Sequence, residues 1–305
     1  MSGRLAGRTR PAGRARQVAA SPLLRRMAPP SADGAIVRVS ATDAGWQYLS
    51  FAAHRMAAGQ TLQRSADRDE VALIVLEGRV TIRAGEHEFA EMGSRATVFD
   101  GQPPPIVLVE PQLSIGVSSR DGALLVVASA PGAEPWSTRA IGSEDVLVES
   151  RGSGNTERRI KHLLPPGAEA GRLIAFEVLT PGGNWSSYPP HKHDTEDPPR
   201  EAYLEEVYFY RFARPTGFAV QRVYTADGSL DETITVHDGD LVLVPRGYHV
   251  VGAAAGYDCY YLNVMAGHRR DWRFTVDPDH AWLMDWDPSR PRDGSRPPPM
   301  EKRDD

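Results

Sequence analysis

The chain has 305 residues, of which 41% are hydrophobic and 25% charged, a composition typical of a globular protein with one large or two smaller domains. Its formal net charge is −5, and because residues 1–33 are rich in Arg, the rest of the chain is more acidic still. This balance argues against nucleic acid as a partner of the folded part. A single cysteine, Cys259, excludes an intramolecular disulfide framework and favours a reducing, cytoplasmic location. No apolar run approaches the roughly 18 residues of a membrane-spanning helix, so membrane insertion is excluded as well.

Taken in chain order, residues 1–33 combine Arg, Gly, Ala and Pro without an apolar period, which predicts a disordered arm. Short β-rich segments separated by turn residues follow from Val71 to Ala130, and a second series runs from about Arg172 to Ala266. This pattern predicts an all-β chain of two tandem barrels, over residues 34–150 and 151–286. The linker-like ESRGSGN at 149–155 marks the boundary, and the tail 287–305 is again predicted to be disordered.

Side chains that bind metals are concentrated in the second half of the chain. His191 and His193 in PPHKHD point to one side of a strand, because strand side chains alternate with period two. Glu206 begins the strand EVYFY, and His249 follows the turn Pro245-Arg246-Gly247. Three imidazoles and one carboxylate hold a divalent metal while leaving positions open for water or substrate.

This order resembles the two motifs of the cupin superfamily, HxH followed by Glu, and then G(x)5PxG followed by His, here starting at Gly239. Eleven residues separate His193 from the Glu205-Glu206 pair, so Glu205 stays open as an alternative ligand to the preferred Glu206. His249 also comes one residue earlier after Pro245 than in many cupins.

A more specific likeness covers nearly all of residues 35–286. The segments PPHKHD, EEVYFYRF, GFAVQRVYTADGSLDET, VPRGYH and YDCYYLNVMAG together resemble the 5-deoxy-glucuronate isomerase family of inositol catabolism, although GYHVV lacks the expected Pro after the His. The resemblance implies a bicupin, two jelly-roll barrels with metal only in the second. The first half agrees, because it holds only His54 and His87 and has no HxH.

The activity that the resemblance implies is an aldose–ketose isomerisation, of 5-deoxy-D-glucuronate to 5-deoxy-2-keto-D-gluconate (2-deoxy-5-keto-D-gluconate), through an enediol. One divalent metal per chain, Zn or Mn with Fe or Ni as alternatives, would bind the C1 and C2 oxygens as a Lewis acid. The 4-deoxy-hexosulose-uronate isomerases of pectin breakdown are related to this family, so the exact uronate stays open.

Such a reaction also needs groups that move protons. Glu205, if it is not a metal ligand, is a candidate general base. Tyr208, Tyr248 and Tyr261 are candidates for shuttling the oxygen-bound proton, although aromatic side chains on strands more often serve packing.

The substrate carboxylate needs a cation. The bidentate guanidinium of Arg222 is preferred, because strand parity turns Lys192 away from the ligands, and Lys192 is kept as a second candidate. Asn263, near the end of YYLN, is a candidate for hydrogen bonding to the small-molecule substrate.

Two other functions fit the same residues. Three His and one Glu also hold Fe(II) in a cupin dioxygenase, and a non-catalytic sugar-binding bicupin would use the metal structurally. The Arg, Tyr and Asn side chains near the motifs favour a hydroxylated acid over an apolar aromatic substrate. Exposed barrel edges favour a homo-oligomer, and no DNA-binding helix pair accompanies the barrels.

Overall fold

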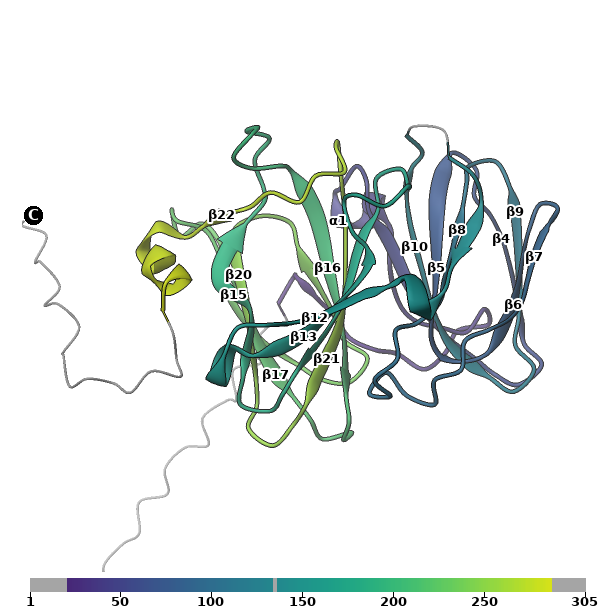
Figure 1. The fold of residues 1–305 in the computed structure, drawn as a ribbon, viewed down its shortest axis with the longest axis horizontal. Coiled ribbons are helices and arrows are strands. Elements are labelled where there is room, and N and C mark those ends of the chain that lie inside the picture. Colours follow the sequence, from purple (N-terminus) through teal and green to yellow (C-terminus); the bar gives the residue numbers. More distant parts are fainter. Residues whose placement is uncertain (1–20, 134–135, 287–305) are drawn as a thin grey trace, which may run out of the picture.

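Strands dominate the computed structural model, which describes residues 21–133 and 136–286 (Figure 1). The four helical segments of this described part of the chain are short: α1 (Ala41–Ala44), η1 (Ser143–Asp145), η2 (Gly154–Thr156) and η3 (Pro278–Met284). No helix in these two ranges is long and apolar enough to cross a membrane. The all-β prediction is therefore confirmed.

The first barrel consists of two antiparallel sheets. The larger has the strand order β11 (Arg139–Ile141), β8 (Ile106–Val109), β5 (Asp69–Gly78), β10 (Ala123–Pro131), β3 (Ser50–Met56) and β2 (Ala35–Val39). The smaller has the order β4 (Thr61–Ser65), β9 (Ser114–Ser118), β6 (Val80–Ala84) and β7 (His87–Met92). Apolar side chains of both sheets fill the interior between them.

The second barrel repeats this plan. Its larger sheet has the order β1 (Leu24–Arg25), β19 (Leu241–Val244), β16 (Leu204–Phe212), β21 (Cys259–Gly267), β14 (Ile174–Thr180), β13 (Arg158–Leu164) and β12 (Leu147–Arg151). The smaller sheet has the order β18 (Asp231–Val236), β17 (Ala219–Tyr224), β20 (Tyr248–Ala253), β15 (Trp185–Lys192) and β22 (Thr275–Val276).

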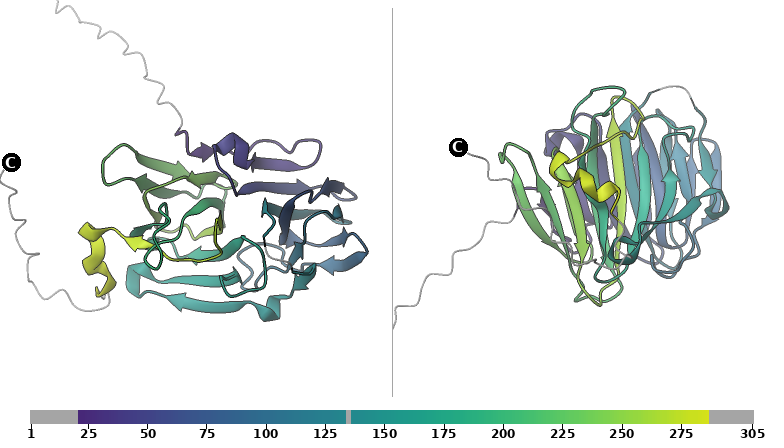
Figure 2. Two further views of the ribbon diagram at one scale, coloured as in Figure 1. Left: turned by 90° about the horizontal axis from the view of Figure 1, so that it is seen from above. Right: turned by 60° about the vertical axis from the view of Figure 1, so that its left-hand side comes forward.

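The two barrels lie side by side, with η3 on the side of the second barrel that faces away from the first (Figure 2). A shared apolar cluster joins their large sheets, with Phe51 of β3 against Phe209 of β16 among its contacts. Strands of these sheets are consequently buried on both faces, and β21 has every residue buried. Such strands appear in the sequence as continuous apolar runs, whereas β6 of the smaller sheet alternates.

Each barrel contributes a buried carboxylate that holds the backbone of the other. Glu70 of β5 accepts hydrogen bonds from the backbone N–H groups of residues 171, 172 and 173, just before β14. Glu205 of β16 accepts from the N–H groups of residues 47, 48 and 49, just before β3. Carboxylates bonded to several N–H groups make strong, directional contacts, so these two clamps fix the relative position of the barrels.

The domain boundaries differ somewhat from the sequence prediction. Residues 21–33 of the expected disordered arm are placed, because β1 pairs with β19 and Leu23 is buried in the core of the second barrel. The sheets change from the first barrel to the second between Ile141 and Leu147, a few residues before the predicted linker. The rest of the predicted arm, residues 1–20, and the predicted tail lie outside the described residues.

Candidate metal centre and cavity

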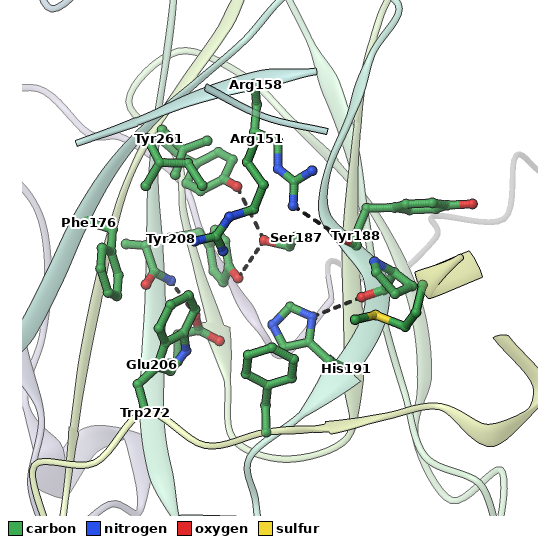
Figure 3. Close-up of a pocket in the computed structure, with 16 residues that line it drawn as sticks. Arg151, Arg158, Phe176, Ser187, Tyr188, His191, Glu206, Tyr208, Tyr261 and Trp272 are labelled. Carbon is green, nitrogen blue, oxygen red and sulfur yellow. Dashed lines mark hydrogen bonds between the residues drawn. The ribbon is translucent and has the colours of Figure 1, made fainter. Parts of the chain in front are cut away.

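A cavity of about 160 Å³ lies inside the second barrel, between its large sheet, β15 and the segment that follows β21 (Figure 3). A single water needs roughly 10–15 Å³ of cavity volume, so the cavity has room for several waters or one small sugar acid. Strand alternation positions its polar wall. Glu206 and Tyr208 point inward from β16, and the neighbouring strand β21 of the same sheet contributes Tyr261 and Asn263, with Tyr208 and Asn263 paired in register.

Three of the predicted metal ligands converge in this barrel. His193, Glu206 and His249 are all buried, and their donor atoms lie within 4.8 Å of one another. Glu206 Oε2 lies 3.0 Å from His193 Nε2 and 3.1 Å from His249 Nε2. Among the described residues, no other group of three or more His, Cys, Asp or Glu side chains meets so closely.

The protonation pattern of these three residues fits a bound cation. His193 Nδ1 lies 3.0 Å from the Leu204 carbonyl oxygen, which only accepts, so Nδ1 carries a proton and Nε2, 3.0 Å from Glu206 Oε2, is the nitrogen that a metal would bind. His249 Nε2 is buried without a hydrogen-bond partner, because its approach to Glu206 is close but not aligned for a hydrogen bond. Two imidazole nitrogens and a carboxylate directed at one point form a donor set suited to a divalent metal.

The electrostatics of the cluster agree. Burial opposes ionisation of Glu206, but His249 and His193 outweigh it and lower its pKa to about 2. Asn263 donates a hydrogen bond to Glu206 Oε1 and so orients the carboxylate. Burial likewise opposes protonation of His193, yet Glu206 raises the pKa of His193 overall. The carboxylate is therefore ionised across the physiological range.

His191 lines the cavity beside this group, without belonging to it. Its ring centroid is 4.6 Å from that of His249 and 6.4 Å from that of His193. Its Nδ1 lies 3.0 Å from the carbonyl oxygen of Pro189, so Nδ1 donates and the Nε2 lone pair is free. Burial and His249 lower its pKa to about 3, so His191 is neutral at pH 7. Its assignment as a fourth ligand stays a prediction.

Three hydroxyl groups in the same cavity are connected by hydrogen bonds. Ser187 Oγ lies 2.9 Å from Tyr208 Oη and 3.2 Å from Tyr261 Oη, and so joins the two phenols (Figure 3). Ser187 adopts φ +49°, a left-handed conformation that few non-glycine residues occupy. Burial raises the pKa of Tyr261 to about 12 and that of Tyr208 further above its usual range. Both phenols are therefore protonated at neutral pH.

The structure does not bring two of the proposed proton-transfer residues into the cavity. Glu205 is adjacent to Glu206 on β16, so it points to the opposite face of the sheet and is occupied by the backbone clamp on the first barrel. Tyr248 is adjacent to His249 on β20 and lies on the outer face, where its ring centroid is 5.5 Å from that of Tyr224. The predicted roles of Glu205 and Tyr248 in proton transfer are therefore corrected, because each side chain lies on the face of its strand that points away from the cavity.

The two predicted carboxylate-binding cations also lie elsewhere. Arg222, on the outer face of β17, makes a two-point ion pair with Asp231 at 2.9 Å and stacks over Tyr224. Lys192 contacts Asp194 at 2.6 Å and Glu201 at 2.9 Å. The charge of each is already paired, and neither residue lines the cavity.

Sequence reasoning missed several lining residues. Arg151, Arg158 and Ser187 supply polar atoms, and aromatic side chains such as Trp272 and Phe274 supply apolar walls. The sequence does indicate Arg158. In the strand RRIKHLL it lies two residues before the apolar Ile160, so both side chains point to the same, inward face of the strand. Nothing in the sequence marked Ser187.

Two jelly-roll barrels with a metal-type centre in the second define a bicupin. The fold is shared with the oxalate decarboxylase of Lactobacillus farciminis, at a TM-score of 0.61 and 11% identity, covering 87% of this chain and 91% of that one. Within the bicupins, the chain belongs to the KduI/IolB family, whose family model matches residues 23–283. The predicted family resemblance is thus confirmed.

Relatives of known name are similar over most of their length. The 5-deoxy-glucuronate isomerase of Geobacillus thermodenitrificans (strain NG80-2) is 46% identical over 256 residues, 84% of this chain and 93% of the relative. That of Bacillus subtilis (strain 168) is 36% identical over 248 residues, 81% of this chain and 92% of the relative. The crystal structure of an IolB-like protein from Salmonella typhimurium LT2 superposes with a TM-score of 0.83 at 40% identity, covering 86% of this chain and 99% of that one.

Proposed function

We propose that this protein is a metal-dependent 5-deoxy-glucuronate isomerase that interconverts 5-deoxy-D-glucuronate and 5-deoxy-2-keto-D-gluconate. The observation that carries the proposal is the convergence of His193, Glu206 and His249 at a cavity, in a chain 46% identical to an enzyme of that name. The isomerisation moves the C2 proton to C1 and the O2 proton to O1, so it needs charge stabilisation and proton transfer, but no redox partner.

The metal centre is assigned to one divalent ion, Zn or Mn, held by His193, Glu206 and His249 with His191 as fourth ligand. Such an ion would supply a Lewis acid for the C1 and C2 oxygens of the sugar. The protein orients the ligands through the Leu204 carbonyl and the amide of Asn263.

The hydroxyl cluster is suited to the oxygen-bound proton. Tyr208 and Tyr261 are both protonated at neutral pH and donate hydrogen bonds to sugar oxygens. Ser187 connects them and allows a proton to pass between two neighbouring oxygens of the substrate. Tyr208 and Tyr261 are also the two groups of the predicted proton-transfer set that line the cavity.

The apolar walls strengthen these contacts. Phe176, Trp272 and Phe274 also line the cavity and reduce its contact with water. Electrostatic interactions and hydrogen bonds are stronger in such a medium, so the negative charge of an enediol intermediate is stabilised more effectively there.

Proton NMR of the metal-loaded protein with 5-deoxy-D-glucuronate in D₂O tests the proposal. We expect loss of the aldehyde-derived signals, formation of the ketose and incorporation of deuterium at C1. A chelator and the variant His193→Ala should both abolish the reaction, whereas His268→Ala, an exposed histidine outside the site, should not. Absence of turnover in metal-loaded protein would overturn the proposal, and oxygen consumption would point to a dioxygenase instead.

A further inference from the structure

We propose that Arg158 binds the carboxylate of the substrate and thereby determines which end of the sugar acid reaches His193, Glu206 and His249. The inference rests on the proposed function for the identity of the substrate. Arg158 thereby takes the role that the sequence predicted for Arg222.

Arg158 carries a buried positive charge that no described carboxylate pairs with directly. Its side chain lines the cavity, the residue is 8% exposed, and among residues 21–133 and 136–286 no Asp or Glu forms an ion pair with it. The neighbouring Arg151 differs, because its guanidinium is 2.5 Å from Glu149 Oε1 and also lies over the Trp272 ring. Isolated buried charges are unfavourable, so a cavity lined by one favours a ligand that brings the opposite charge.

The guanidinium is also held in place before any ligand arrives. Nη1 donates to the Thr156 carbonyl at 3.0 Å and Nη2 donates to the Tyr188 carbonyl at 3.1 Å. A guanidinium has five N–H groups, so donors remain for a ligand. Carbonyl oxygens orient the guanidinium without neutralising it. Arg158 therefore presents a fixed, charged fork, whose geometry matches a carboxylate.

The position of Arg158 gives the substrate a direction. Arg158 lies at one end of the cavity and Glu206 and His191 at the other, with Ser187 between them (Figure 3). In a six-carbon uronic acid the carboxylate and the aldehyde are at opposite ends of the chain. With the carboxylate on Arg158, the aldehyde end extends past Ser187 toward the histidines, where the proton transfers are required.

A matched pair of inert ligands tests this role without turnover. L-gulonate and D-glucitol differ only in that a carboxylate replaces a terminal alcohol, and neither can isomerise. Their dissociation constants are measured by calorimetry on metal-loaded wild type, Arg158→Gln and Arg158→Lys. Arg222→Gln, which removes an equal charge from the outer face of the same barrel, is the control. Metal content and Tm are compared in parallel.

We expect Arg158→Gln to weaken gulonate binding by about 10- to 100-fold, which corresponds to about 1.4–2.8 kcal/mol. Glucitol binding should change little, Arg158→Lys should be intermediate, and Arg222→Gln should match wild type. In kinetics with the uronate, KM should rise by more than kcat falls.

Equal weakening of gulonate and glucitol by Arg158→Gln, or a loss of metal content with it, would show that Arg158 only supports the fold, and would overturn the inference. Unchanged gulonate binding in Arg158→Gln, or no gulonate binding to wild type, would also overturn it. Arg158-dependent gulonate binding in a wild type that fails to isomerise the uronate would instead refute the proposed function alone.

Discussion

The substitution Glu205→Gln separates two roles for a carboxylate that is adjacent to a metal ligand in the sequence. Glu205 is fully buried, and its oxygens accept from three backbone N–H groups of the first barrel, Gln47 at 2.7 Å, Tyr48 at 2.9 Å and Leu49 at 2.8 Å. We therefore expect Glu205→Gln to destabilise the protein and to leave the chemistry intact.

The magnitude follows from these contacts. Gln keeps one oxygen, which replaces Oε2 opposite Tyr48 and Leu49, but it places an NH₂ group against the N–H of Gln47. The substitution removes one hydrogen bond to a charged group, worth about 1.5–3 kcal/mol, and weakens the other two. We expect the free energy of unfolding to fall by about 2–4 kcal/mol, which lowers Tm by roughly 5–15 °C.

The assay compares thermal unfolding with isomerase activity measured well below Tm. Glu70→Gln is the matched control, because Glu70 makes the reciprocal clamp and lies in the barrel without the metal centre. Both variants should lose stability to a similar extent and keep wild-type metal content. A Glu205→Gln protein with unchanged Tm and abolished activity would refute the clamp and restore Glu205 as the general base.

Three further outcomes are expected. Removing the metal with a chelator should lower Tm, and adding it back at about 100 times its Kd should restore roughly 2.7 kcal/mol of stability. The Tm of His193→Ala should not respond to added metal. If the hydroxyl groups of Tyr208 and Tyr261 transfer protons, Tyr208→Phe and Tyr261→Phe should each lower kcat by about 10²- to 10⁴-fold. Elemental analysis should show the wild-type metal content in both variants, and a wild-type kcat in both would contradict the role. Burial lowers the pKa of His54 below its ordinary value of 6.5, so the unfolded chain binds more protons than the folded one below that pH, and stability falls as the pH falls through this range. The Tm of His54→Gln should therefore decrease less between pH 7 and pH 5 than that of wild type, and parallel pH profiles would rule out this contribution.

Local sequence patterns were sufficient for much of the site. Period-two alternation and the order of His193, Glu206 and His249 predicted a metal centre in the second half, and these residues do converge. Alternation also turned Lys192 away from the histidines, as observed. The strand and turn pattern predicted an all-β chain of two barrels. These features depend on spacing along one strand or on turn residues, which are properties of short segments.

Tertiary packing decided the rest. The sequence favoured Glu206 but left Glu205 open as the ligand, because both faces of β16 are buried and the apolar pattern does not distinguish the barrel interior from the interface between barrels. The choice depends on how the first barrel packs against the second. Arg158 entered the site for a similar reason: β13 meets the cavity only through its pairing with β14, which lies between it and β21. Parity is a local property of a strand, but which face becomes an active site is set by the sheets that pack against it.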